Sequence, residues 1–185
     1  MYLIVGLGNP EPEYCLTRHN MGFDVINRLS KQYKIDVKKI GFKSLYGIGE
    51  IENQKVILCK PQTYMNLSGD AVIEISRFYK INKENIIVIY DDIELPVSQV
   101  KIRKKGGPGT HNGMKSVVYS LGTEDFTRIR IGTGKPIDKN ELIEYVIKKM
   151  KYEEYEKYIP GIEKGKEAVE LIMKENIDTA MNRIN

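Results

Sequence analysis

The sequence predicts a single-domain α/β layered fold over residues 1–185, in which helices flank a mixed, mostly parallel twisted sheet. Short apolar runs of strand type alternate along the chain with longer stretches in which apolar residues recur every three or four positions. Such alternation is typical of layered α/β proteins. A chain of 185 residues, 41% of them hydrophobic, can fill one core and is short for two.

The first half of the chain is predicted to contain three strands and two helices. The strands are expected at residues 2–5, 45–51 and 55–60, a helix at residues 20–33, and a second helix with its apolar face on residues 71–79. We expect a turn at Asn53-Gln54 between the two consecutive strands. Asn66 or Ser68 is expected to cap the second helix, because such side chains accept hydrogen bonds from helix N–H groups.

The second half continues the alternation. A β-branched run at residues 86–90 predicts a fully buried strand that ends in Asp91-Asp92. A strand, a helix, a strand and two amphipathic helices are then expected at residues 100–103, 112–121, 127–132, 142–150 and 162–173. The last two helices are rich in Glu and Lys, which is typical of solvated helices that cover a core.

The sequence contains no apolar run of eighteen residues, and its first residues enter a strand without a basic leader or a cleavage site. We therefore expect a cytoplasmic protein that contacts no membrane. Cys15 and Cys59 lack metal-site spacing, so we expect free thiols, with neither a disulfide nor a zinc site. No apolar surface helix favours self-association, so a monomer is expected.

Basic charge is concentrated in one central segment. Residues 97–137 carry 8 basic and 2 acidic side chains, whereas the residues before them carry 12 of each and those after them 9 basic and 11 acidic. This segment is expected to face an anionic partner. Lys101 and Arg103 alternate along one predicted strand, and Arg128 and Arg130 along another, so each pair shares one strand face. The two pairs align if the strands are neighbours.

His19 is the leading candidate for an acid–base catalyst, because histidine takes and returns a proton near neutral pH. It is one of two histidines and lies between a Gly- and Pro-rich turn and the start of a helix. Junctions of this kind hold the working groups of many α/β enzymes. A histidine at a helix start can equally have no chemical task, so its polar neighbours decide between the two interpretations.

Asparagines at helix starts and one carboxylate complete a polar constellation. Capping alone explains Asn20, Asn66 and Asn112. Helix starts that follow strand ends nevertheless meet at the same crevice of an open sheet. The residues that can point into this crevice are Asn9, His19, Asn66, Asp91 and Asn112. Neutral amides with one histidine and one carboxylate suit hydrolysis by a deprotonated water, with hydrogen bonds to the developing oxyanion, and do not suit metal binding.

Three other kinds of site find less support. Asp91-Asp92 leaves open a magnesium site, since paired carboxylates at a strand end often hold a divalent cation. Gly6-Leu7-Gly8 is similar to the start of a dinucleotide fingerprint, but the third glycine is missing and Pro10 and Pro12 prevent an immediate helix. A nicotinamide cofactor is therefore excluded. Cys59 lies in an apolar strand, which disfavours a nucleophilic role.

Five sequence blocks follow one another between residues 3 and 136. They are Gly8-Asn9-Pro10 with Tyr14 and Thr17-Arg18-His19-Asn20-Met21-Gly22; Lys60-Pro61-Gln62-Thr63-Tyr64-Met65-Asn66-Leu67-Ser68-Gly69; Asp91-Asp92-Ile93-Glu94-Leu95-Pro96; Gly109-Thr110-His111-Asn112-Gly113; and Phe126 with Arg128-Ile129-Arg130-Ile131-Gly132. In this order they resemble the bacterial-type peptidyl-tRNA hydrolases. The chain length also agrees with that family.

The resemblance implies an enzyme that cleaves the ester between a peptide and the 3′-terminal ribose of tRNA, which recycles tRNA from prematurely released peptidyl-tRNA. It implies that His19 is the general base and that Asp91 orients it, with no metal and no cofactor. Substrate and water would be bound by Asn9, Asn66 and Asn112, and Tyr14 and Met65 would line the pocket near the scissile bond.

The resemblance also implies a basic clamp for the phosphates of tRNA. The clamp falls on Arg103 and Arg130, with Lys101, Lys104, Lys105 and Arg128 nearby. Peptidyl-tRNA is thus the expected partner.

The chain departs from the family pattern at several loop positions. Glu11 replaces a glycine after Asn-Pro, Glu94 stands where aspartate is common, and Val97-Ser98 replaces a Pro-Gly turn. Pro108 and Thr110 vary a Gly/His-rich loop, which puts the geometry of that loop in doubt. None of these changes affects His19 or Asp91. Two further functions stay open, namely an RNA-binding module without chemistry and a magnesium phosphohydrolase.

Overall fold

The computed structural model describes the backbone of residues 1–185 and every side chain except that of Lys139. Its centre is one sheet in the strand order β2-β3-β4-β1-β5-β7-β6. The strands are β1 (Tyr2–Gly6), β2 (Lys39–Gly41), β3 (Ser44–Ile51), β4 (Gln54–Pro61), β5 (Ile86–Asp92), β6 (Val100–Arg103) and β7 (Thr127–Gly132). β4, β1, β5 and β7 run parallel, and the outer strands β3, β2 and β6 add antiparallel pairs. The sheet is therefore mixed and parallel in its centre, which confirms the predicted α/β class.

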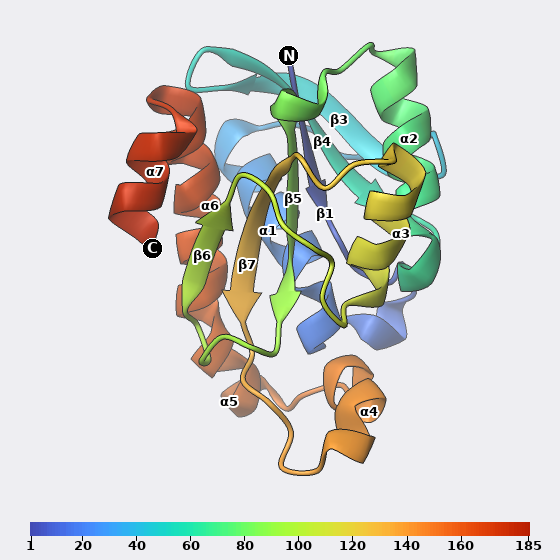
Figure 1. The fold of residues 1–185 in the computed structure, drawn as a ribbon, viewed down its shortest axis with the longest axis vertical. Coiled ribbons are helices and arrows are strands. Elements are labelled where there is room, and N and C mark those ends of the chain that lie inside the picture. Colours follow the sequence, from blue (N-terminus) through green and yellow to red (C-terminus); the bar gives the residue numbers. More distant parts are fainter.

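Helices cover both faces of this sheet (Figure 1). They are α1 (Met21–Tyr33), α2 (Ser68–Phe78), α3 (Asn112–Leu121), α4 (Leu142–Ile147), α5 (Tyr152–Tyr155), α6 (Ile159–Lys174) and α7 (Ile177–Ile184). α2 packs against α3 on one face, and α1 packs against α6 on the other. α4 lies beyond the carboxyl ends of β5 and β7, at the bottom of the view in Figure 1.

The central strands are buried on both faces, which explains why their sequences are almost continuously apolar. In β1, Ile4 packs with the α1 and α6 side, whereas Leu3 and Val5 pack with the α2 and α3 side. In β5, Ile89 and Val88 divide between the two sides in the same way. Each of these side chains is fully buried and contributes about 1.5–3 kcal/mol relative to its exposed state. Two apolar cores thus fix the strands that carry the site.

The predicted elements of the first 132 residues are confirmed, with ends that shift by up to three residues. The turn between β3 and β4 is wrong by one residue. It consists of Glu52 and Asn53, with φ of 48° and 61°, because Gln54 already pairs with Ile51 in the ladder. Positive φ at both central residues is the geometry of the tight hairpin turn that matches strand twist.

The predicted cap of α2 is also wrong. Neither Asn66 nor Ser68 accepts a hydrogen bond from the first turn of the helix. Ser68 is instead the first helical residue, and its hydroxyl donates to the carbonyl of Met65 at 2.8 Å. The turn η3 (Met65–Leu67) leads directly into the helix and takes the place of a side-chain cap.

The C-terminal third differs most from the prediction. The helix expected over residues 142–150 ends at Ile147, since the chain turns so that the N–H of Met150 donates to the carbonyl of Leu16 at 3.0 Å. α7 was not predicted, and neither was the short strand β2 in the first half of the chain. α6 is more than solvated cover, because Ile162 and Val169 lie in the core beside α1. Among the described helices, none has the length and hydropathy needed to cross a bilayer.

The start of α1 approaches the sheet very closely at Gly22. A Cβ at this position would lie 2.4 Å from both the carbonyl oxygen of Ile89 and the amide nitrogen of Leu7. Only glycine leaves room for this contact. The close approach brings the turn η2 (Arg18–Asn20), which leads into α1, to the carboxyl ends of β1 and β5.

We predict that Gly22→Ala lowers the free energy of unfolding by about 1–3 kcal/mol, the usual cost of overpacking a tight contact. Urea unfolding monitored by circular dichroism measures the change. Gly41→Ala is the matched control, because its Cβ would meet only the ring of Tyr46, at 3.3 Å. Equal losses in the two variants would show that the contact between α1 and the sheet is not under steric constraint.

Candidate active site

A cleft of about 570 Å³ opens at the carboxyl ends of the parallel strands. Asn9 follows β1, Met65 follows β4, and Asp91 lies near the end of β5, and all three line the cleft. The glycine-rich loop 106–109 and α4 form further walls. The crevice outside the carboxyl ends of the strands is the usual position for a ligand site in α/β proteins with a parallel sheet.

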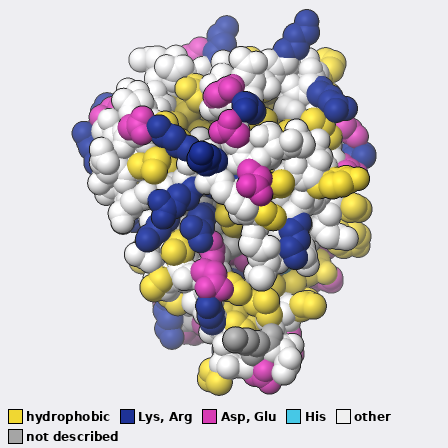
Figure 2. Space-filling model, viewed as in Figure 1, with side chains coloured by type: hydrophobic (Ala, Val, Ile, Leu, Met, Phe, Trp, Pro, Cys, Tyr) yellow, Lys and Arg dark blue, Asp and Glu magenta, His cyan; other side chains and the backbone are white. Residues whose placement is uncertain are grey.

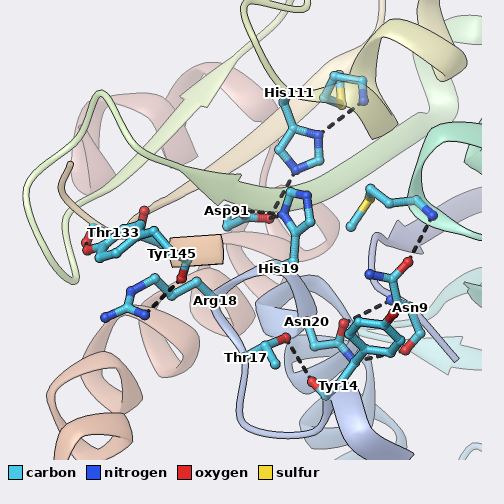
Figure 3. Close-up of polar contacts among 12 residues, drawn as sticks. Asn9, Tyr14, Thr17, Arg18, His19, Asn20, Asp91, His111, Thr133 and Tyr145 are labelled. Atoms are coloured by element: carbon cyan, nitrogen blue, oxygen red, sulfur yellow. Dashed lines mark hydrogen bonds and ion pairs between the residues drawn. The ribbon is translucent and has the colours of Figure 1, made fainter. Parts of the chain in front are cut away.

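Two histidines converge on one carboxylate at the floor of this cleft (Figure 3). His19 Nδ1 lies 2.8 Å from Asp91 Oδ2, and His111 Nε2 lies 3.0 Å from Asp91 Oδ1. Asp91 is only 2% exposed. Burial would raise the pKa of this carboxyl, but the two imidazoles outweigh burial and hold the pKa well below its usual value. Asp91 is therefore ionised and accepts from both rings.

The tautomer of His111 follows from its second contact. His111 caps α3, and its Nδ1 accepts the N–H of Met114 at 3.2 Å. The proton of the neutral ring must then lie on Nε2, which donates to Asp91. His111 is for this reason a hydrogen-bond donor to the carboxylate and has no free basic nitrogen.

The same reasoning leaves His19 with a free basic nitrogen. Its Nδ1–H donates to Asp91, so Nε2 carries a lone pair. Among the described residues, no group donates to Nε2, and the side chain remains 12% exposed in the cleft. His19 can therefore remove a proton from a molecule bound there, and Asp91 stabilises the imidazolium that forms.

The three side chains also have the composition of a metal site, with ligand atoms within 4.8 Å of one another. The bond to Met114 argues against that role, because it places the proton of His111 on the nitrogen that a metal would need. The alternative magnesium site at Asp91 and Asp92 is wrong on geometry. Asp92 Oδ2 accepts from Arg130 Nε at 2.5 Å and faces a different set of partners from Asp91.

Asn9 is held in place by two neighbours. Asn20 does not cap α1; its side chain bonds both backbone groups of Asn9, at 2.8 and 2.9 Å. Asn9 Oδ1 in turn accepts the N–H of Met65 at 2.9 Å. This leaves the amide nitrogen of Asn9 as a hydrogen-bond donor in the wall of the cleft.

The other expected binding residues divide into two groups. Met65, Asn66 and Asn112 line the cleft, and both asparagines are exposed. Tyr14 does not line the cleft. It ends the turn η1 (Pro12–Tyr14), where its carbonyl accepts the hydroxyl of Thr17 at 2.8 Å.

The two basic strands are neighbours, which meets the condition under which their charged pairs were expected to align. Lys101 pairs with Arg130 and Arg103 with Arg128 across β6 and β7. Figure 2 shows lysine and arginine side chains gathered over β6, beside the hollow of the cleft. Arg103, Lys105, Arg128 and Arg130 line the cleft.

Two basic residues depart from the expected clamp. Arg128 is 1% exposed and donates to the carbonyls of Gly107 at 2.6 Å and Glu124 at 3.2 Å. It lies deeper than expected because its guanidinium packs over the ring of Phe126, 4.7 Å from the ring centre, and binds the glycine-rich loop. Arg128 is therefore not an exposed phosphate ligand. Lys104 forms an exposed ion pair with Asp178 at 2.6 Å, which contributes little in water.

Two features of the site were missed from sequence. His111 was not assigned a role, although it is the second histidine and stands at a helix start. The apolar wall from α4 was expected only as solvated cover, yet Leu142, Ile143 and Val146 line the cleft. Ile143 is 72% exposed. An apolar residue at an exposed position of a helix that was expected to be solvated is the signal in the sequence that could have indicated a binding face.

The fold and the site together are those of a layered α/β protein in which a histidine, held by a buried carboxylate, faces a cleft beside two basic strands. A family model described as peptidyl-tRNA hydrolase matches residues 3–185. The chain belongs to the peptidyl-tRNA hydrolase family.

Relatives and solved structures agree with this assignment over the full chain. Peptidyl-tRNA hydrolase of Clostridium botulinum (strain Alaska E43 / Type E3) is 52% identical over 185 residues, which is 100% of this chain and 96% of the relative. The protein of that name from Alkaliphilus oremlandii is 49% identical, with 100% of both chains covered. The crystal structure of peptidyl-tRNA hydrolase from Acinetobacter baumannii superposes with a TM-score of 0.94 at 36% identity and covers 100% of this chain and 94% of that one.

We predict that Asp91→Asn lowers the free energy of unfolding at pH 7 by about 1–3 kcal/mol, because two charge-assisted hydrogen bonds are lost. The pKa of Asp91 is lower in the folded state than its unfolded value of about 3.9. Its stabilising effect is therefore complete above about pH 4 and is lost as the pH falls further.

Thermal unfolding from pH 7 to pH 2.5 measures this effect, and the difference between parent and Asp91→Asn should shrink as the pH falls. Asp36→Asn is the control, since Asp36 has a side chain that is 70% exposed. A difference that stays constant down to pH 2.5 would show that Asp91 is not ionised in the folded protein.

Proposed function

We propose that the protein hydrolyses the ester between the peptide and the 3′-terminal ribose of peptidyl-tRNA, with His19 as general base and Asp91 as the group that orients it. The observation that carries this proposal is the free Nε2 of His19, which faces the cleft while Nδ1–H is held by Asp91. Family membership supplies the substrate class.

The reaction begins when His19 Nε2 removes a proton from a water molecule that attacks the ester carbonyl. The carbonyl oxygen becomes an oxyanion, which the amide donors Asn9, Asn66 and Asn112 are placed to receive. The tetrahedral intermediate then expels the ribose oxygen, and the imidazolium of His19 returns its proton to that oxygen. The products are a tRNA with a free terminal hydroxyl and a peptide carboxylic acid, which releases its proton to water and becomes a carboxylate.

Binding of the tRNA is assigned to the basic residues beside the cleft. Arg130 is oriented through Nε by Asp92, which leaves its two terminal NH2 groups for a phosphate. Arg103 and Lys105 also line the cleft, and Lys101 in β6 and Lys104 directly after it extend the charge. Met65 is placed to contact the peptide end of the substrate. We propose that the protein acts as a monomer in the cytoplasm.

We predict that His19→Asn lowers kcat for peptidyl-tRNA by about 10²- to 10⁴-fold, the contribution of a positioned acid–base group. Asparagine keeps a donor at the position of Nδ1 and removes only the base. His111→Gln is the matched control, because its amide retains a donor at the position of Nε2, and we expect a loss of less than about tenfold. If His19→Asn kept near-full activity while His111→Gln abolished it, the base would be misassigned.

We predict that Arg103→Ala and Arg130→Ala each reduce the slope of log affinity for tRNA against log salt by about one unit, because each removes one phosphate contact. Arg128→Ala should leave that slope unchanged and lower the free energy of unfolding by about 1–3 kcal/mol, since buried carbonyls lose their partners. Equilibrium binding over a salt series and urea unfolding give both quantities. A reduced slope for Arg128→Ala together with unchanged stability would return Arg128 to the phosphate clamp.

A further inference from the structure

Arg18 immediately precedes His19 in η2, yet its side chain contacts a segment far away in the chain. The side chain is buried, at 5% exposure. Its Nε donates to the hydroxyl of Tyr158 at 3.0 Å, one terminal nitrogen donates to the carbonyl of Tyr145 at 3.0 Å, and the other donates to Glu154 at 2.6 Å. The guanidinium thus binds three different positions in the segment that follows β7.

Further contacts hold α4 and the residues after it against η2 and its neighbours. The guanidinium carbon of Arg18 lies 3.8 Å from the centre of the Tyr145 ring. The hydroxyl of Tyr145 donates to the carbonyl of Thr133 at 2.7 Å, and the N–H of Met150 donates to the carbonyl of Leu16 at 3.0 Å. Figure 3 shows Arg18 alongside Tyr145, with both to the left of His19 and Asp91.

α4 depends on these contacts because it is only six residues long. A helix of that length has no stability of its own in water. It nevertheless presents Leu142, Ile143, Val146 and Ile147 to the cleft, and Figure 2 shows hydrophobic side chains gathered at this end of the hollow. Arginine suits the task, since its planar group stacks on a ring and donates in several directions at once, which lysine does not.

We propose that Arg18 is a positioning residue that holds α4 as the apolar wall on which the peptide part of the substrate packs, at a fixed distance from His19. The proposal rests on the proposed function. Arg18 and His19 are consecutive residues of one turn. The same short piece of backbone therefore holds the wall that contacts the peptide and supplies the base that activates the attacking water. An apolar side chain at the C-terminal residue of the peptide gains affinity from this arrangement, and glycine at that position gains none.

The test compares Arg18→Lys with the parent on two substrates, N-acetyl-phenylalanyl-tRNA and N-acetyl-glycyl-tRNA. We expect the KM for the phenylalanyl substrate to rise about tenfold, which corresponds to losing much of the burial of one apolar side chain. The kcat should stay within about twofold, and the KM for the glycyl substrate should not change. Arg28→Lys is the matched control, because Arg28 pairs with Glu163 between α1 and α6, outside the cleft.

Hydrogen exchange supplies a readout that does not depend on activity. Amides of residues 142–147 should exchange faster in Arg18→Lys, and those of α6 should not. Glu154→Gln is a second variant should Arg18→Lys fail to fold; it keeps the shape of the side chain and should raise the phenylalanyl KM about threefold.

Four results would overturn the proposal. An equal KM change on both substrates, or the same change in Arg28→Lys, would make Arg18 a structural residue only. A fall in kcat on both substrates at constant KM would mean that Arg18 acts on His19 and not on α4. Unchanged exchange in residues 142–147 would mean that α4 is held by other contacts. A parent protein that cleaves neither substrate would refute the proposed function, while the exchange measurement would still report on the attachment of α4.

Discussion

The active site depends on one buried carboxylate that receives hydrogen bonds from two imidazole rings. Asp91 can remain ionised in an apolar surrounding only because His19 and His111 both donate to it. The two rings are not equivalent, since His111 is also tied to the backbone of α3 through its other nitrogen. One histidine is thereby reserved for structure and the other is left with a free lone pair for chemistry.

The surrounding fold gives the two carboxylates at the end of β5 different partners. Asp91 and Asp92 are consecutive on β5, so their side chains point in opposite directions. Asp91 serves the histidines, whereas Asp92 holds Arg130 at the edge of the basic strands. The contact of Gly22 with the sheet places His19 within reach of Asp91. The bonds between Asn9 and Asn20 hold Asn9 in the wall of the cleft.

The elements that could be predicted from sequence are those with local causes. β5 was clear because its run of Ile and Val is continuous, as expected for a strand buried on both faces. The two basic pairs were expected to align only if β6 and β7 were neighbours, and they are. Depth could not be predicted: alternation assigned Arg128 to a face, but its burial follows from a tertiary contact with the glycine-rich loop. His111 was missed because its pairing with Asp91 is a tertiary contact between a strand end and a helix start 20 residues apart, which no local pattern encodes. The role of α4 was missed for the same reason.

Asp91 and the capping bond from the N–H of Met114 assign opposite tautomers to the two histidines. Long-range ¹H–¹⁵N correlation spectra of the imidazole nitrogens at pH 8, with each signal assigned through a single histidine variant, measure this directly. The structure predicts that His19 is protonated on Nδ1 and bare at Nε2, and that His111 is protonated on Nε2 and bare at Nδ1. A protonated Nε2 on His19, or the same tautomer on both rings, would contradict the account.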